Sequence, residues 1–310
     1  MGDLLRAIVE PGFFGSAPVH VALLIGGVAA VVSGIVGTFT VMRGQSYAGH
    51  ALGDISVTGG SASVLIGISP LWGFAGGSVV AAGIMDMIGV RRPRGRDLAI
   101  GIVRGAGLGL AALFLFWDTT YTSTTGAPVT ILFGSIFTID SSMIPVIAAF
   151  SLAAVGIVAA LYRPLLLSSV STDLAVVRGV PVRIAGALCL VAIALAVSLS
   201  AITIGAILST ALLVGPAATA LRLTSRPGLV MLWAALIGIG ATWLGVLLAY
   251  DSYYWPPNRQ GWPVSFFVVV LILIFYLLAQ LLGGWIGRDG RNGRNELDGR
   301  NEERACSQAS

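Results

Sequence analysis

The chain has 310 residues, of which 56% are apolar and only 10% are charged, with a mean hydropathy of +0.91 and a formal charge of +4. Soluble domains carry roughly a quarter charged residues, so this composition excludes a single large soluble core and predicts an all-α, polytopic integral membrane protein. Two cysteines, Cys189 in an apolar run and Cys306 in a polar tail, favour neither a disulfide framework nor a thiolate metal site.

About nine segments are predicted to be transmembrane helices. A short mixed segment, residues 1–18, precedes them and is expected outside the membrane. The predicted spans are 19–42, 49–68, 71–90, 98–117, 141–162, 184–200, 203–221, 229–249 and 264–285. Residues 129–139 are too short to cross, which predicts a re-entrant or interfacial piece. The polar repeats of residues 287–310 predict a disordered tail.

The arginines predict the orientation of these spans. If the N-terminus lies outside, all arginines except Arg6, Arg104 and Arg259 fall on the inner side or in the tail. Positive residues concentrate on the cytoplasmic side of membrane proteins. We therefore expect the N-terminus outside and the tail in the cytoplasm.

Two ionisable residues stand four apart in the second span, which is otherwise glycine, alanine, serine and aliphatic. His50 and Asp54 would share one face of a helix, and such a pair is costly inside a membrane unless it faces a partner, a cavity or an ion. Imidazole plus carboxylate suits a divalent ion such as Zn²⁺ or Mn²⁺. The residues alone leave three roles open: a structural pair, a transient metal contact or a proton site.

A second charged pair is predicted between neighbouring spans. Asp86 lies near the inner end of the third span and Arg104 at a comparable depth in the fourth, so we expect a structural ion pair between them.

Several catalytic motifs are absent from the sequence. It contains no GxxxxGK[ST] phosphate loop, and it contains neither HExxH nor GxSxG. The chain is therefore expected to have no ATPase or hydrolase site of its own.

Five stretches, in order, resemble permeases of the ABC-3 family, which move zinc, manganese or iron. They are MRGQSYAGHALGD at 42–54, RDLAIGI at 96–102, LFGS at 132–135, STDLA with RGVPV at 171–182, and GPAATA at 215–220. The resemblance covers residues 19–285 and implies a transmembrane permease domain, similar to type II ABC importers, in a bacterial plasma membrane.

The resemblance also implies partners and roles. These are a second copy of the chain, a separate ATP-hydrolysing subunit inside, a metal-binding protein outside and no permanently bound cofactor, with no nucleic acid. The loop after the fifth span would form the coupling helix that docks on the ATPase, through Asp173, Leu174, Ala175, Arg178, Gly179 and Pro181.

One departure concerns the candidate metal residues. The common family pattern places Asp first and His four residues later, whereas here His50 precedes Asp54. The resemblance still implies that both contact a divalent metal in passage. Two other hypotheses stay open: a permease for an iron chelate or cobalamin, and a secondary transporter that moves a proton on the same pair.

Overall fold

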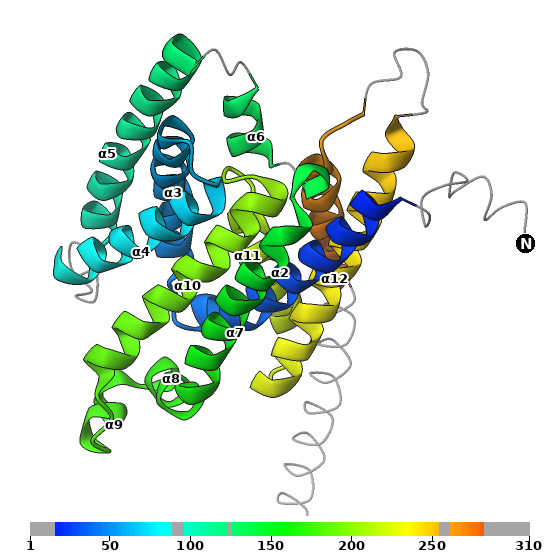
Figure 1. The fold of residues 1–310 in the computed structure, drawn as a ribbon. Helices are drawn as coiled ribbons and strands as arrows, with labels where there is room; N and C mark the ends of the chain where they lie inside the picture. The colour runs from blue at the N-terminus through cyan, green and yellow to red at the C-terminus, as the bar shows by residue number, and fades with distance from the viewer. Residues whose placement is uncertain (1–15, 89–95, 123–125, 135, 254–260, 282–310) are drawn as a thin grey trace, which may run out of the picture.

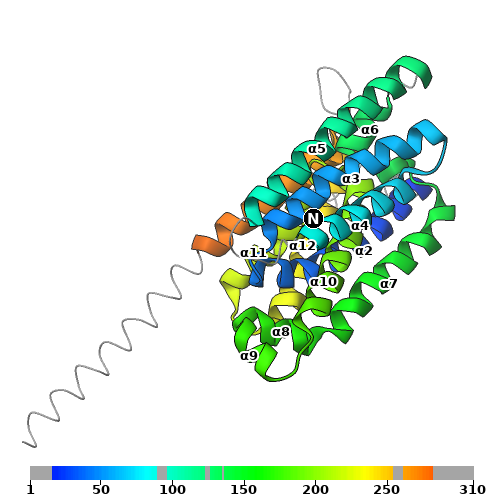
Figure 2. The same cartoon turned by 90° about the vertical axis from the view of Figure 1, so that its left-hand side faces the viewer.

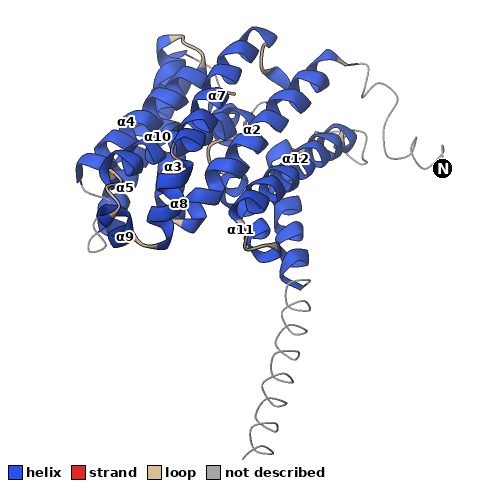
Figure 3. Cartoon of the chain, turned by 90° about the horizontal axis from the view of Figure 1, so that it is seen from below, coloured by secondary structure: helices blue, strands red, loops and turns tan. Residues whose placement is uncertain are grey.

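The computed structural model describes residues 16–88, 96–122, 126–134, 136–253 and 261–281. All regular elements within these ranges are helical, as Figure 3 shows by colour, so the all-α prediction is confirmed. The predicted tail 287–310 and most of the predicted N-terminal segment 1–18 lie outside the described residues.

Four long helices form the first half of the fold (Figure 1). They are α2 (Ala17–Met42), α3 (Ser46–Ile66), α4 (Pro70–Ile88) and α5 (Arg96–Trp117), followed by a π-helical turn at Asp118–Thr122. The segment predicted as re-entrant or interfacial forms the seven-residue helix α6 (Ala127–Phe133) and a 3-10 turn at Ile136–Thr138. At about 1.5 Å per residue, α6 is far too short to cross a membrane.

The second half contains a helical hairpin at one end and five long or medium helices. After a 3-10 turn at Ser141–Met143 come α7 (Ile144–Ala160), α8 (Tyr162–Val170), α9 (Thr172–Val177), α10 (Val182–Ile204), α11 (Ser209–Leu223), α12 (Pro227–Ser252) and a last helix, Val264–Leu281.

Each of the nine predicted spans overlaps a helix, although span 203–221 begins in α10 and continues in α11. Only six helices of the described residues are long and apolar enough to cross a membrane. Those six are Pro18–Met42, Ile100–Tyr121, Ser141–Ala160, Val182–Ile204, Pro227–Ser252 and Val264–Leu281. The count of nine is not confirmed, because α3, α4 and α11 fall outside this group. α11 has only 15 residues, and α3 is rich in small and polar side chains.

Helix α10 lies at the centre of the bundle and is the most deeply buried of the six. It packs against α2, α3, α4, α7 and α11. Two buried hydrogen bonds between hydroxyls join it to its neighbours, one between Ser200 and Ser33 of α2 at 2.8 Å and one between Ser198 and Ser78 of α4 at 2.6 Å. Hydroxyls near small residues are a common means of joining membrane helices.

Helix α3 lies between α4 and α5, and the three form one side of the molecule (Figures 1 and 2). It approaches α4 so closely that a Cβ on Gly59 would overlap the carbonyl oxygen of Gly73. The small residues of α3 thus let it pack closely against its neighbours, and α3 carries the ionisable pair.

Candidate functional site

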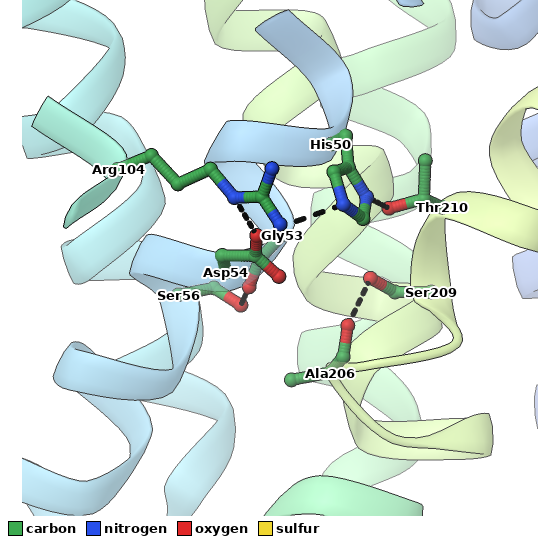
Figure 4. A network of polar contacts seen from close by, with 8 residues as sticks. All are labelled: His50, Gly53, Asp54, Ser56, Arg104, Ala206, Ser209 and Thr210. Carbon is green, nitrogen blue, oxygen red and sulfur yellow. Dashed lines mark hydrogen bonds and ion pairs between the residues drawn. The ribbon is translucent and has the colours of Figure 1, made fainter. Parts of the chain in front are cut away.

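His50 and Asp54 lie on one face of α3, as the spacing predicted (Figure 4). The imidazole Nε2 is 3.7 Å from Asp54 Oδ2. His50 stands in the second turn of the helix and Asp54 in the third. The two polar groups are therefore close enough for both to act on one small ligand.

Arg104 reaches this pair from α5. Its Nε forms an ion pair with Asp54 Oδ2, which is the same carboxylate oxygen that faces His50. Both atoms are buried and make no other hydrogen bond within the described part of the chain. The ion pair is thus what compensates the two charges for their loss of water.

This contact corrects the predicted pairing of Arg104 with Asp86. Helices α4 and α5 are neighbours in sequence but pack little against each other, because α3 lies between them. Asp86 is also only two residues from the last residue of α4, whereas Arg104 is about two turns inside α5. Asp54 supplies the carboxylate that lies at the same depth in the bundle as Arg104.

Thr210, at the start of α11, contacts the imidazole at the nitrogen that does not face Asp54. Its Oγ1 lies 3.0 Å from His50 Nδ1. The threonine reaches this position because the chain breaks between α10 and α11 at Gly205, which has a φ of 91°. Gly53 lets α11 approach, since a Cβ there would lie 3.0 Å from Ser209 Oγ and 3.3 Å from Thr210 Oγ1.

Sequence reasoning missed Thr210. A single threonine in an apolar segment carries no motif, and its distance of 160 residues from His50 gives no local signal. The available clue was Gly205, a residue suited to breaking a helix in mid-span.

The cluster is partly open. The side chains of His50 and Arg104 are 36% and 31% exposed, whereas Asp54 is 12% exposed. The carboxylate is thus the most buried group of the cluster, and the imidazole and the guanidinium are partly exposed.

The chemistry of these groups suits weak, transient metal binding. If Nδ1 carries the proton and donates it to Thr210, Nε2 presents its lone pair toward Asp54, which is the tautomer that a metal-binding histidine needs. No group of three or more His, Cys, Asp or Glu side chains gathers within the described ranges. A structural zinc site uses four ligands, so two favour an ion that binds and then leaves.

The predicted coupling segment forms part of a helical hairpin at the opposite end of the bundle from α6 (Figure 1). Helix α9 begins at a cap in which Ser171 Oγ accepts a hydrogen bond from the Leu174 amide at 3.3 Å. The chain then turns at Gly179, which has a φ of 72°, and enters α10. Of the predicted coupling residues, Ala175 is buried and Leu174, Arg178, Gly179 and Pro181 are exposed, while Asp173 lies in α9.

Apolar side chains cover much of the outer face of α9. Leu174, Val176 and Val177 are 51%, 60% and 86% exposed, and Val170 on α8 is 80% exposed. Exposed apolar residues that gather at one place are typical of a surface that another protein covers.

A cavity of about 390 Å³ lies at the end of the bundle near α6. Asp140 lines it and caps the turn before α7, accepting a hydrogen bond from the Ser142 amide at 2.8 Å. That hydrogen bond, together with those from the Ser142 and Ser141 hydroxyls, lowers the pKa of Asp140 below its ordinary value. The carboxylate is therefore charged at neutral pH.

A family model and two named relatives all indicate a membrane transport protein. The family model described as ABC 3 transport family matches residues 18–282. The manganese transport system membrane protein MntC of Listeria innocua is 28% identical over 247 residues, covering 79% of this chain and 85% of that protein. The manganese import system permease protein ScaB of Streptococcus pneumoniae is 30% identical over 231 residues, covering 74% and 81%.

Two solved structures share the fold. PsaBC from Streptococcus pneumoniae, solved in complex with Fab, has a TM-score of 0.74 and 25% identity, covering 86% of this chain and 92% of that one. An inward-facing structure described as a metal-chelate type ABC transporter has a TM-score of 0.67 and covers 87% of both chains at 16% identity.

Proposed function

Because this chain belongs to the ABC 3 transport family, we propose that it is the membrane-spanning permease subunit of an ATP-driven importer for a divalent metal ion. The observation that carries the proposal is the facing pair of His50 and Asp54, 3.7 Å apart and partly exposed. The named relatives that transport manganese favour Mn²⁺ as the cargo, with Zn²⁺ next.

The energy would come from a separate subunit. The sequence contains no phosphate loop, so ATP would be hydrolysed by a partner that docks on α8 and α9. The exposed Leu174, Val176 and Val177 supply an apolar docking surface for that partner. Because α9 leads directly into α10, the central helix, a displacement of α9 would be passed to the centre of the bundle.

A second copy of the chain would cover the open side of the site. Arg104 is 31% exposed on α5, and an arginine facing lipid at such a position is costly. On the same helix, no atom from the part of the chain that the structure describes lies near the place of a Cβ on Gly105 or Gly109. Glycines four apart let two membrane helices approach closely, so α5 of a partner copy fits this face.

The rest of the assembly follows from the direction of transport. With the N-terminus outside, α9 would lie in the cytoplasm near the ATPase, and an external metal-binding protein would deliver the ion at the end near α6. That end carries the cavity lined by Asp140, whose negative charge attracts cations.

The test is the metal content of whole cells, measured by mass spectrometry in a strain that lacks this gene. The strain would carry the wild type, His50→Ala, Asp54→Ala or His20→Ala at matched expression. The chain has two histidines, and the other one, His20, is exposed at the start of α2, so it serves as a control. We expect manganese to be restored by the wild type and His20→Ala but not by the two site variants.

The other outcomes separate the rival functions. Equal restoration by all four would make the pair structural and favour a chelate as cargo. Import that persists without the ATPase subunit and collapses with an uncoupler would replace the proposal with a proton-coupled transporter.

A further inference from the structure

Two groups of the site lie against the same carboxylate oxygen. Asp54 Oδ2 faces His50 Nε2 at 3.7 Å and is also the atom that Arg104 Nε contacts. In Figure 4 the guanidinium and the imidazole approach the carboxylate from different helices, α5 and α3. Arg104 therefore contacts the same carboxylate oxygen that faces the imidazole.

A divalent ion held by His50 and Asp54 would need this oxygen. With ligand bonds of about 2.1 Å and ligand angles of about 90–110°, the two donor atoms stand about 3.0–3.4 Å apart. The observed 3.7 Å requires only a slight closure of the pair. The guanidinium and the ion would then occupy the same volume against the same atom.

The two cations also repel each other. A divalent ion at the carboxylate and a guanidinium at contact distance are like charges in a partly buried place, where water screens them poorly. Arg104 has to leave Asp54 for the ion to bind well.

The structure leaves room for that movement. In helices a long side chain leans toward the preceding turn, and the residue three positions before Arg104 is Gly101. Among the described residues, only the Tyr47 hydroxyl comes near the place of a Cβ on Gly101, at 3.8 Å. A displaced guanidinium could lie along this face and donate a hydrogen bond to that hydroxyl.

We propose that Arg104 is a tethered counter-ion, which occupies the cation position at Asp54 between transport cycles and is displaced when a divalent ion binds. This inference rests on the proposed function. Arg104 lowers the affinity of the site and so helps the ion to leave, and it disfavours monovalent ions, because exchanging one single charge for another gains no electrostatic energy.

The test measures Mn²⁺ binding to the complete permease–ATPase complex in lipid nanodiscs, from the electron paramagnetic resonance signal of free Mn²⁺. We expect Arg104→Gln to tighten binding about tenfold or more, because a nearby positive charge is removed, and to slow ATP-driven Mn²⁺ uptake. Arg104→Lys keeps the charge and should bind more like the wild type. Arg222→Gln, far along α11 from Thr210, is the matched control and should bind like the wild type.

A second variant guards against a simple folding defect. Asp54→Asn combined with Arg104→Gln leaves a neutral pair of similar shape. It should bind Mn²⁺ as weakly as Asp54→Asn alone, because Arg104 has no effect once the carboxylate for which it competes is gone. Unchanged or weaker binding by Arg104→Gln, in a complex that elutes as a single species, overturns the inference and leaves the proposed function standing. If the wild type neither binds nor imports Mn²⁺, the proposed function itself fails.

Discussion

The imidazole of His50 is fixed by groups on both of its nitrogens. Thr210 contacts Nδ1, and Asp54 with its arginine faces Nε2. Groups that hold the second nitrogen of a metal-binding histidine set its tautomer and orientation. A hydroxyl from another helix is therefore part of the proposed site although it does not touch the ion.

At this scale we predict that Thr210→Val lowers Mn²⁺ affinity about tenfold, because the hydrogen bond to Nδ1 is lost while the volume is kept. Thr210→Ser keeps the hydroxyl and is expected to behave like the wild type. The measurement is a Mn²⁺ titration of the purified complex. Equal affinities for the valine and serine variants would show that the hydroxyl does not orient His50.

Among the elements, α3 depends on close contact with α4. Gly59 and Gly73 bring the two backbones together, and a side chain on either would overlap the other helix. The same contact fixes the height of α3 in the bundle and hence that of His50 and Asp54.

We predict that Gly59→Ala destabilises the protein by about 1–3 kcal/mol, because the added methyl forces two backbones apart. Gly76→Ala on α4 is the matched control, since no atom of the described residues lies within 4 Å of a Cβ at that position. The check is the thermal unfolding midpoint in detergent. A midpoint for Gly59→Ala that equals that of the control would contradict the observed packing.

Helix α9 gives a prediction of its own. Val177→Asp places a charge on an apolar side chain that is 86% exposed, so the chain should still fold but should lose most of its ATPase subunit in co-purification. Val177→Ile keeps an apolar surface and should retain the partner. If the aspartate variant copurifies normally, α9 is not the docking surface.

At the level of the whole molecule, the site is partly exposed beside α5 rather than sealed in the core. α5 is the least buried of the six candidate spans, and it carries both the exposed arginine of the site and a row of accessible glycines. A second copy would close this side and bring its own His50 and Asp54 to the same path.

This arrangement predicts that a cysteine at position 105 forms a disulfide between two copies in native membranes. The experiment uses a chain in which Cys189 and Cys306 are replaced by serine. Gly156→Cys on α7 is the control, because that glycine is equally open but lies on a different helix. Dimer bands on a non-reducing gel are expected for position 105 alone, and the reverse pattern would place the interface on α7.

The sequence located the helices well because hydropathy and proline positions act locally. It also placed His50 and Asp54 on one face, since four-residue spacing is a property of the helix itself. It paired Arg104 with the wrong aspartate, because that choice assumed that neighbours in sequence are neighbours in space. Thr210 was missed for a related reason: its place depends on the break at Gly205, which only the packed bundle shows.

The exposed valines of α9 have a consequence for the amount of the subunit in the cell. If the proposed ATPase docks on α9, a copy made without that partner leaves Val176 and Val177 uncovered, and chaperones and proteases can bind there. The amount of this subunit in the membrane should then follow the supply of its partner. Production of the two chains from one transcript is accordingly the route to a good yield.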